Sequence, residues 1–434
     1  MTAIAAETQS VRPAEAELRK VTLAAFVGTA LEWYDFFLFG MTAVLVFAPL
    51  YFASDQPVVS TIQSFLAFAV GPLARPLGGI LWGHVGDRYG RRPALIGTVM
   101  LMGVATTLIG LLPTYASIGV AAPIMLVALR ALQGVAAAGE WGGATLLVVE
   151  NAAPERRGFY GAILNMSIPV GTVMASGAVA LLGGLPREDF LSWGWRIPYL
   201  ASIVLIGLSI WLRWKIAETP TFQALVATKH TQHAPIRELL RFSWLRVLTG
   251  AALYFYSASG FLIFTTFMIS YATQTLGLHP SVILTALTAA PVAQFISTYI
   301  SARLANRIGV APTVIIGFAM ATVLAFPLFW VVDTRDPGLI IGGYIVYFAL
   351  VTIAYGPLGV LLTQIFPPHL RYSGFAISVN FSALVGGFAP AVATLALAAS
   401  NNQSWGPALL LFLVTLVSLI GSIAAYRLVL PDRG

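Results

Sequence analysis

The chain has 434 residues, of which 58% are hydrophobic and only 9% are charged, and its net charge is +7. Soluble proteins carry about 25% charged residues, so this composition excludes a soluble globular enzyme, and the mean hydropathy of +0.85 is typical of a polypeptide that lies in lipid. The absence of cysteine excludes disulfides, iron–sulfur clusters and thiolate zinc sites. At roughly 36 residues for one membrane helix and its turn, the length allows about a dozen spans and no large extramembrane domain.

Long apolar runs follow one another along the whole chain. Each run is longer than the roughly 9–11 residues of a barrel strand. Lipid offers no hydrogen-bond partner to an open backbone, so we expect helices. The predicted fold class is an all-α membrane protein with twelve transmembrane helices in two six-helix bundles and both termini in the cytoplasm. The predicted spans are residues 22–51, 60–83, 93–113, 118–149, 158–183, 193–214, 246–272, 280–302, 313–332, 338–362, 372–399 and 405–429.

The lysines and arginines are distributed unevenly between the two sides of the predicted membrane. With the N-terminus inside, 19 of the 24 basic residues fall in cytoplasmic segments, whereas Arg187, Arg196 and Arg335 fall on the opposite side. Positive residues mark cytoplasmic loops, so topology explains the basic net charge, and we expect no nucleic-acid partner. The predicted segments are a cytoplasmic tail over 1–20, six-helix bundles over 21–214 and 246–429, a cytoplasmic central loop over 215–245 and a cytoplasmic tail over 430–434.

An internal repeat supports the division into two halves. The segment at 83–93, GHVGDRYGRRP, aligns with ARLANRIGVAP at 302–312, about half the chain length away. Repeats at this spacing are typical of transporters built by duplication. The first segment resembles the signature loop of the major facilitator superfamily, and the residues that carry the signature are Gly83, Asp87, Arg88, Gly90, Arg91 and Arg92. The second segment departs from the signature at Asn306, Val310 and Ala311.

Further segments resemble the metabolite:proton symporter family within that superfamily. They are LEWYDFFLFG at 31–40, ARPLGGILWGHVGDRYGRRP at 74–93, RALQGVAAAGEWGG at 130–143, PERRGFYGA at 154–162, WGWRIPYL at 193–200 and ETPTF at 218–222. The resemblance implies a bacterial inner-membrane carrier of a small metabolite such as 2-oxoglutarate, citrate, shikimate or a betaine, coupled to protons and working by alternating access. It also implies that the signature loop and Glu150 form a cytoplasmic gate. Antiporters of the superfamily carry a Gly-Pro-rich fifth span, and a single proline there, Pro169, favours symport.

Five ionisable residues lie well inside the predicted spans, all in the N-terminal half: Glu32, Asp35, Arg75, Arg130 and Glu140. A charge at the bilayer centre costs on the order of 2.5–3.5 kcal/mol, so such residues are expected to face a wet cavity or the bundle interior. A guanidinium binds a carboxylate through two hydrogen bonds, so both arginines are candidates for binding substrate. The three acids are candidates for proton coupling. The alternative is structural pairing, of Arg75 with Asp35 or Glu32 and of Arg130 with Glu140.

The predicted binding residues are completed by neutral polar side chains. They are Gln133 in the N-terminal half and Tyr254, Tyr256, Gln294, Tyr355 and Asn380 in the C-terminal half. Each of them is also explained by a hydrogen bond between helices. Gly79 and Gly83 are spaced as a motif for close helix packing.

These observations predict a transporter that imports a small carboxylated metabolite by proton symport. Its expected partners are that substrate, protons and the lipid bilayer, and we expect a monomer. Nucleotide-binding loops and metal-ligand spacings are absent from the sequence, so we expect no enzyme activity, no cofactor and no metal. The alternatives are a proton-coupled exporter of drugs or metabolites, an importer of a zwitterionic osmolyte such as a betaine, and a nutrient-sensing receptor that does not transport.

Overall fold

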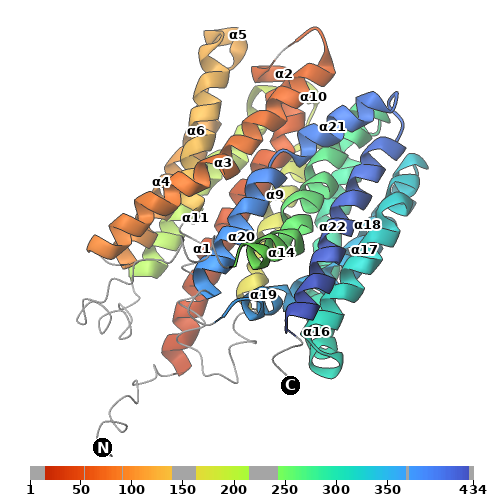
Figure 1. Ribbon diagram of the computed structural model, residues 1–434. Coiled ribbons are helices and arrows are strands. Elements are labelled where there is room, and N and C mark those ends of the chain that lie inside the picture. The colour runs from red at the N-terminus through yellow and green to blue at the C-terminus, as the bar shows by residue number, and fades with distance from the viewer. Residues whose placement is uncertain are drawn as a thin grey trace, which may run out of the picture.

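The computed structural model describes residues 15–52, 54–89, 91–138, 163–214, 243–367 and 371–429, and in this part of the chain all regular structure is helical (Figure 1). The helices of the first half are α1 Glu15–Thr42, η1 Ala43–Phe47, α2 Ala48–Tyr51, α3 Pro57–Tyr89, α4 Arg91–Leu111, α5 Tyr115–Ile118, α6 Ala121–Ala137, α9 Ser167–Leu182, α10 Arg187–Asp189, η3 Phe190–Gly194 and α11 Arg196–Trp214.

The helices of the second half begin after residue 243. They are α14 Trp244–Phe255, η4 Tyr256–Gly260, η5 Ile263–Phe267, α15 Met268–Ser270, η6 Tyr271–Thr275, α16 Pro280–Ile308, α17 Val310–Asp333, α18 Pro337–Val351, η7 Thr352–Ala354, α19 Tyr355–Gln364, α20 Arg371–Gly386, α21 Ala389–Ala399 and α22 Trp405–Val429. The segments η1, η3, η4, η5 and η6 are π-helical turns.

The described residues form ten helical segments that are long and apolar enough to cross a membrane, together with two shorter apolar helices, Ile96–Leu111 and Ala121–Ala137. The prediction of an all-α membrane fold is therefore confirmed, while the count of twelve spans and the cytoplasmic termini stay predictions. Two helices extend past their predicted spans, because α1 begins at Glu15 and α3 continues to Tyr89. The first extension has the sequence EAELRK, which consists of strong helix formers and so continues the helix.

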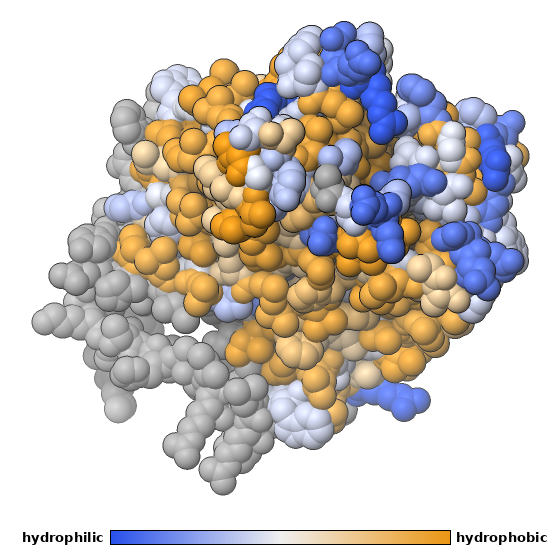
Figure 2. Space-filling model, turned by 90° about the horizontal axis from the view of Figure 1, so that it is seen from above, coloured by the Kyte–Doolittle hydropathy of each residue, from blue (hydrophilic) through white to orange (hydrophobic). Residues whose placement is uncertain are grey.

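Large apolar side chains point outward along many helices. Leu181, Val204 and Val323 are among the most exposed of them, and Figure 2 shows apolar residues over much of the molecule seen from the end where α2, α5 and α10 lie. Apolar surface on this scale is unfavourable in water and favourable in lipid. The exposed surface is therefore that of a membrane protein.

Many hydroxyl groups inside the helices bond to the backbone of their own helix. Thr42 donates to the carbonyl oxygen of Leu38 at 2.7 Å, Thr172 to that of Ile168 at 2.9 Å, and other threonines repeat this bond to the residue four positions earlier. Such a bond lets a polar side chain stay inside an apolar helix without an orphaned donor.

The helices of each half pack mainly against one another. In the first half α1 packs against α9, α3 against α6, and α4 against α11; in the second half α17 packs against α22, and α16 against α18 (Figure 1). Between the halves, α9 packs against α16, α3 against α20 and α21, and α1 against η5. The rings of Phe37 and Phe261 meet across this boundary with centroids 5.3 Å apart.

Helices α3 and α6 approach closely through small residues. A Cβ on Gly134 would collide with the backbone of Gly71, and a Cβ on Gly78 would collide with the carbonyl oxygen of Val135 and lie 2.8 Å from the Cβ of Ala138. Gly79 has open space around it, so the prediction that Gly79 contributes to close packing is wrong. The glycine one position earlier faces α6 instead, because the rotation of α3 about its axis is set by the helices packed against it.

Replacing Gly78 by alanine should destabilise the protein by about 1–3 kcal/mol, since the added methyl overpacks a backbone contact. The same substitution at Gly79 is the matched control and should leave stability unchanged or raise it slightly, because alanine favours a helix more than glycine does. Thermal unfolding of the two purified variants in detergent tests this, and equal melting temperatures for both would contradict the packing described above.

Candidate functional site

A small cavity lies among the helices of the N-terminal half. Three helices present polar side chains to it: α1 through Glu32 and Asp35, α3 through Arg75, and α6 through Arg130 and Gln133. Residues three or four positions apart share a helix face, so α1 and α6 each turn one polar face toward the cavity, and α3 adds a single arginine. The rest of the lining is Phe36, Gly71, Pro72, Met102, Gly134 and Ala137.

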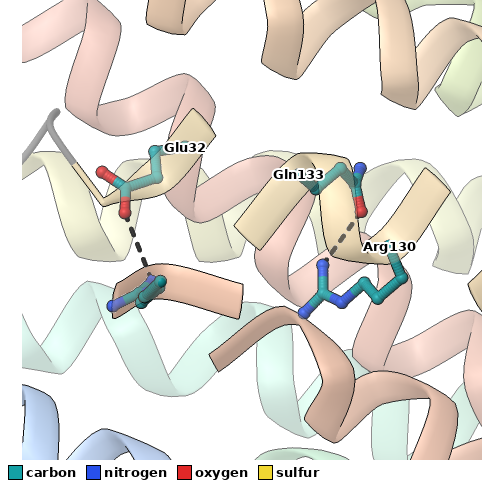
Figure 3. Close-up of polar contacts among 4 residues, drawn as sticks. Glu32, Arg130 and Gln133 are labelled. Atoms are coloured by element: carbon teal, nitrogen blue, oxygen red, sulfur yellow. Dashed lines mark hydrogen bonds and ion pairs between the residues drawn. The ribbon is translucent and has the colours of Figure 1, made fainter. Parts of the chain in front are cut away.

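An ion pair joins α1 and α3 at this cavity. Arg75 Nη2 donates to Glu32 Oε1 at 3.4 Å (Figure 3). The Glu32 side chain is 5% exposed, whereas that of Arg75 is 21% exposed. A charge-assisted N–H···O bond is normally about 2.7–2.9 Å, so this pair is long and the guanidinium keeps an open side. Tyr254 of α14 lies within electrostatic range of both residues and brings the C-terminal half to the edge of the pair.

Arg130 is enclosed far more tightly than Arg75. Arg130 is only 3% exposed. Its guanidinium carbon lies 4.4, 4.7 and 5.5 Å from the ring centroids of Phe39, Phe68 and Phe36. Its Nη1 donates to Gln133 Oε1 at 3.0 Å (Figure 3). Its Nε donates to the carbonyl oxygen of Phe68 at 3.2 Å. Aromatic faces attract a buried cation, so the positive charge is held in one position.

A chain of hydrogen bonds runs from Arg130 to Asp35. Gln133 Nε2 donates to Thr106 Oγ1 at 2.8 Å, and Thr106 Oγ1 lies 2.8 Å from Asp35 Oδ2. The other carboxyl oxygen of Asp35 is 3.4 Å from Ser202 Oγ. Asp35 itself is 5% exposed. The cavity therefore couples an acid and an arginine through two neutral side chains instead of a direct ion pair.

The expectation that the intramembrane charges face a cavity or the bundle interior agrees with the structure for the four that it describes. Glu32, Asp35, Arg75 and Arg130 line one cavity, and the alternative pairing of Arg75 with Glu32 is observed. The fifth charge, Glu140, lies outside the described residues, so its pairing with Arg130 and its role in proton coupling stay predictions.

The predicted cytoplasmic gate lies at the junction of α3 and α4. Gly83, Asp87 and Arg88 occupy the end of α3, and α4 begins with Arg91 and Arg92. Gly90 and Glu150 lie outside the described residues. The gate therefore stays a prediction.

The structure does not bring the predicted C-terminal side chains to the lining of this cavity. Tyr256 is buried and donates to Tyr347 at 3.2 Å, and its ring meets that of Tyr355 edge to face with centroids 6.3 Å apart. Gln294 is buried in α16, and Asn380 is exposed on α20. For Tyr256 the alternative of a hydrogen bond between helices is the one observed.

Sequence reasoning missed the residues that hold the charged side chains in place. Thr106 and Ser202 contact Asp35, but hydroxyl residues are frequent in all the spans and carry no distinguishing signal. The rings of Phe36 and Phe39 stand in the segment LEWYDFFLFG, beside two acids and opposite an intramembrane arginine. That combination of an intramembrane cation and an aromatic cluster is a signal that could have been used.

Metal binding has no support in the part of the chain that the structure describes, since these residues contain no cluster of three histidine or acidic side chains. The chemistry that the cavity offers is binding of anions through guanidinium groups and uptake of protons by carboxyl groups.

Known proteins with a similar sequence are membrane transporters. The sequence pattern of the Major Facilitator Superfamily matches residues 25–390. The shikimate transporter of Escherichia coli is 37% identical over 405 residues, which cover 88% of this chain and 90% of that protein. The proline/betaine transporter of the same organism is 32% identical over 416 residues, 94% of this chain and 83% of that protein. A crystal structure of a D-xylose-proton symporter has the same fold, with a TM-score of 0.78 at 19% identity, and the match covers 95% of this chain and 98% of that one.

Replacing Arg130 by lysine should lower the melting temperature, although the charge is kept. Lysine lacks the planar fork that contacts the three rings and bonds both Gln133 and the Phe68 carbonyl, and each lost hydrogen bond to a charged group costs on the order of 1.5–3 kcal/mol. The exposed Arg187, changed to lysine, is the matched control. An Arg130→Lys variant as stable as this control would show that the enclosure contributes nothing to stability.

Proposed function

This chain belongs to the Major Facilitator Superfamily, and we propose that it imports a small carboxylated metabolite together with protons. Its relatives and structural neighbours are transporters, so it is a multi-pass membrane transporter and not an enzyme. Family membership does not determine the substrate, the coupling ion or the direction of transport, and these three are what we propose.

The charge balance of the cavity carries the proposal. Its described lining has two basic residues, Arg75 and Arg130, and two acidic residues, Glu32 and Asp35. With both acids ionised these four charges sum to zero. When one acid takes up a proton the sum becomes +1, which the carboxylate of a substrate neutralises. Binding of a proton therefore strengthens binding of the anion, and the reverse, because a net charge in a poorly hydrated cavity is costly.

Arg75 is the residue we propose to bind the substrate carboxylate. Its side chain is the more exposed of the two arginines and its contact with Glu32 is long. When Glu32 is protonated, the guanidinium can turn to an incoming carboxylate with two parallel hydrogen bonds. Arg130 supplies a fixed positive charge at the cavity wall, and Gln133 fixes its orientation.

Asp35 and Glu32 are the proton carriers we propose from the described residues, with Glu140 as a third candidate. A carboxyl group in such surroundings changes protonation state as its neighbours and its hydration change. Alternating access then requires the bundles over 21–214 and 246–429 to rock against each other, with the gate at Gly83–Arg92 and Glu150 closing the cytoplasmic side. Tyr254, Tyr256, Gln294, Tyr355 and Asn380 are proposed to orient the substrate from the second bundle when the cavity closes.

The names of the relatives support a carboxylate as the substrate, and they also support a zwitterion as a second candidate. The shikimate transporter, by its name, carries a carboxylic acid. The proline/betaine transporter, by its name, carries zwitterions, and a zwitterion also presents a carboxylate to Arg75. Export of a lipophilic cation is disfavoured by the two arginines of the cavity. We place the protein in the bacterial inner membrane as a monomer.

Uptake into proteoliposomes tests the proposal. With an inwardly directed proton gradient, labelled shikimate, 2-oxoglutarate or citrate should accumulate above equilibrium, and a protonophore should abolish the accumulation. Glycine betaine and tetraphenylphosphonium are the comparison compounds. Accumulation of glycine betaine alone would favour the zwitterion alternative, and binding without any uptake would indicate a receptor.

Changing Arg75 to alanine should weaken binding of the transported carboxylate by about 10- to 100-fold, the size expected for a lost hydrogen bond to a charged group. Arg75→Lys should recover part of the affinity, because the charge remains but the fork is lost. Binding is measured by calorimetry on purified protein, with melting temperature as the control for folding. Unchanged affinity in Arg75→Ala would overturn the assignment of this residue.

Changing Asp35 to asparagine should separate transport from proton coupling. The amide cannot bind or release a proton, so uptake driven by a proton gradient should be lost while exchange of labelled for unlabelled substrate across the membrane continues. We would measure gradient-driven uptake and substrate exchange on the same proteoliposome preparation and compare the two. Gradient-driven accumulation by Asp35→Asn would show that another residue carries the proton.

A further inference from the structure

The carboxyl group of Asp35 lies between two hydroxyl groups from different helices. Thr106 of α4 reaches Oδ2 at 2.8 Å, and Ser202 of α11 reaches Oδ1 at 3.4 Å. Both hydroxyls are themselves buried. The contacts that surround this acid are therefore made by groups that both donate and accept hydrogen bonds.

Each of these hydroxyls has a second acceptor within reach on its own helix. Thr106 Oγ1 lies 2.9 Å from the carbonyl oxygen of Met102, and Ser202 Oγ lies 3.3 Å from that of Pro198. A hydroxyl has one proton to donate and two lone pairs that accept. Each hydroxyl can therefore direct its proton to Asp35 or to the backbone, but not to both at full strength.

The two choices match the two protonation states of the acid. When Asp35 is ionised, Thr106 donates to Oδ2 and accepts from Gln133 Nε2. When Oδ2 carries a proton, Asp35 donates to Thr106, which still accepts from Gln133 and turns its own proton to the Met102 carbonyl. In both states every polar atom of this set has a partner, which matters because an unsatisfied buried polar group is costly.

We propose that Thr106 and Ser202 are positioning residues that set the proton affinity of Asp35: Thr106 exchanges hydrogen-bond partners as the acid gains or loses its proton, and Ser202 donates to the other carboxyl oxygen. The inference rests on the proposed function in taking Asp35 as a proton carrier. The proton comes from water on the outer side as Asp35 is protonated and returns to water on the inner side as the carboxylate reforms. Thr106 and Ser202 keep their own protons throughout.

The charged and titratable groups around Asp35 stay in place during this exchange. They are Arg130 on α6, Arg75 on α3, Tyr199 on α11, and Glu32 and Tyr34 on α1, while α9, which also packs on α1, has no titratable side chain. Gln133 bonds Arg130 and Thr106 in both states, so Arg130 does not have to move. Protonation therefore changes the charge of the cavity without changing its shape.

Infrared spectroscopy of reconstituted protein tests this without a transport assay. The carboxyl C=O band that disappears in Asp35→Asn is assigned to Asp35, and its intensity is followed against pH. In Thr106→Val both states of Asp35 lose a hydrogen bond, and the bond to the ionised carboxylate is the stronger of the two, so the midpoint should move to higher pH by about one unit. Ser202→Ala should give a smaller shift, since its bond is longer. Thr106→Ser keeps the hydroxyl and should titrate as the unchanged protein does.

Thr107→Val is the matched control, because Thr107 is the neighbouring threonine of the same helix and its buried hydroxyl has no hydrogen-bond partner. Its midpoint should stay at the value of the unchanged protein. The inference is overturned if Thr106→Val titrates normally, if Thr107→Val shifts as much, or if no band is assignable to Asp35. If Thr106→Val does not fold, the midpoint of the Asp35 band in Ser202→Ala tests the inference instead. Shifted midpoints in a protein that does not couple carboxylate uptake to protons would sink the proposed function and leave this inference standing.

Discussion

The cost of placing charge inside a membrane is the constraint on which this structure depends. Each ionised group at the bilayer centre costs on the order of 2.5–3.5 kcal/mol unless it is paired or hydrated. The protein keeps the described intramembrane charges, Glu32, Asp35, Arg75 and Arg130, around one cavity whose walls belong to the first bundle. Placing them together reduces the cost of each charge and makes the state of each one depend on the others.

The two arginines of the cavity are held by different interactions, and this difference suits them to different roles. Arg75 has a long contact with Glu32 and a partly exposed side chain, so it can change partners. Arg130 lies against three aromatic rings and bonds a backbone carbonyl and Gln133, so it cannot move without losing several contacts together. In the proposed function, Arg75 is the mobile cation that binds the substrate carboxylate, and Arg130 is the fixed cation that sets the local potential.

The sequence predicted the helices and the inward-facing charges because both follow from the surrounding lipid. A backbone in lipid must form its hydrogen bonds internally, and a charge inside the membrane is stable only beside a partner or water. Gly78 and Gly79 suit a helix contact equally well in sequence, and only the rotation of α3 against α6 decides which one is used. Thr106 is one hydroxyl among many until the approach of α1 and α4 sets it beside Asp35. What the sequence could not predict is therefore the rotation and register of helices, which depend on tertiary packing.

The halves are joined by contacts of another kind, and this difference bears on how they can move. Thr61 donates to Gln274 at 3.0 Å and Thr288 to Ser176 at 2.9 Å, so these bonds across the boundary join neutral groups. The Arg75–Glu32 pair and the chain from Arg130 to Asp35 lie within the first half. Separating ions in lipid costs far more than exchanging neutral hydrogen bonds. In the proposed mechanism, a rocking motion that breaks these neutral bonds leaves the charged contacts intact, so the first half would carry a proton through the motion as one body.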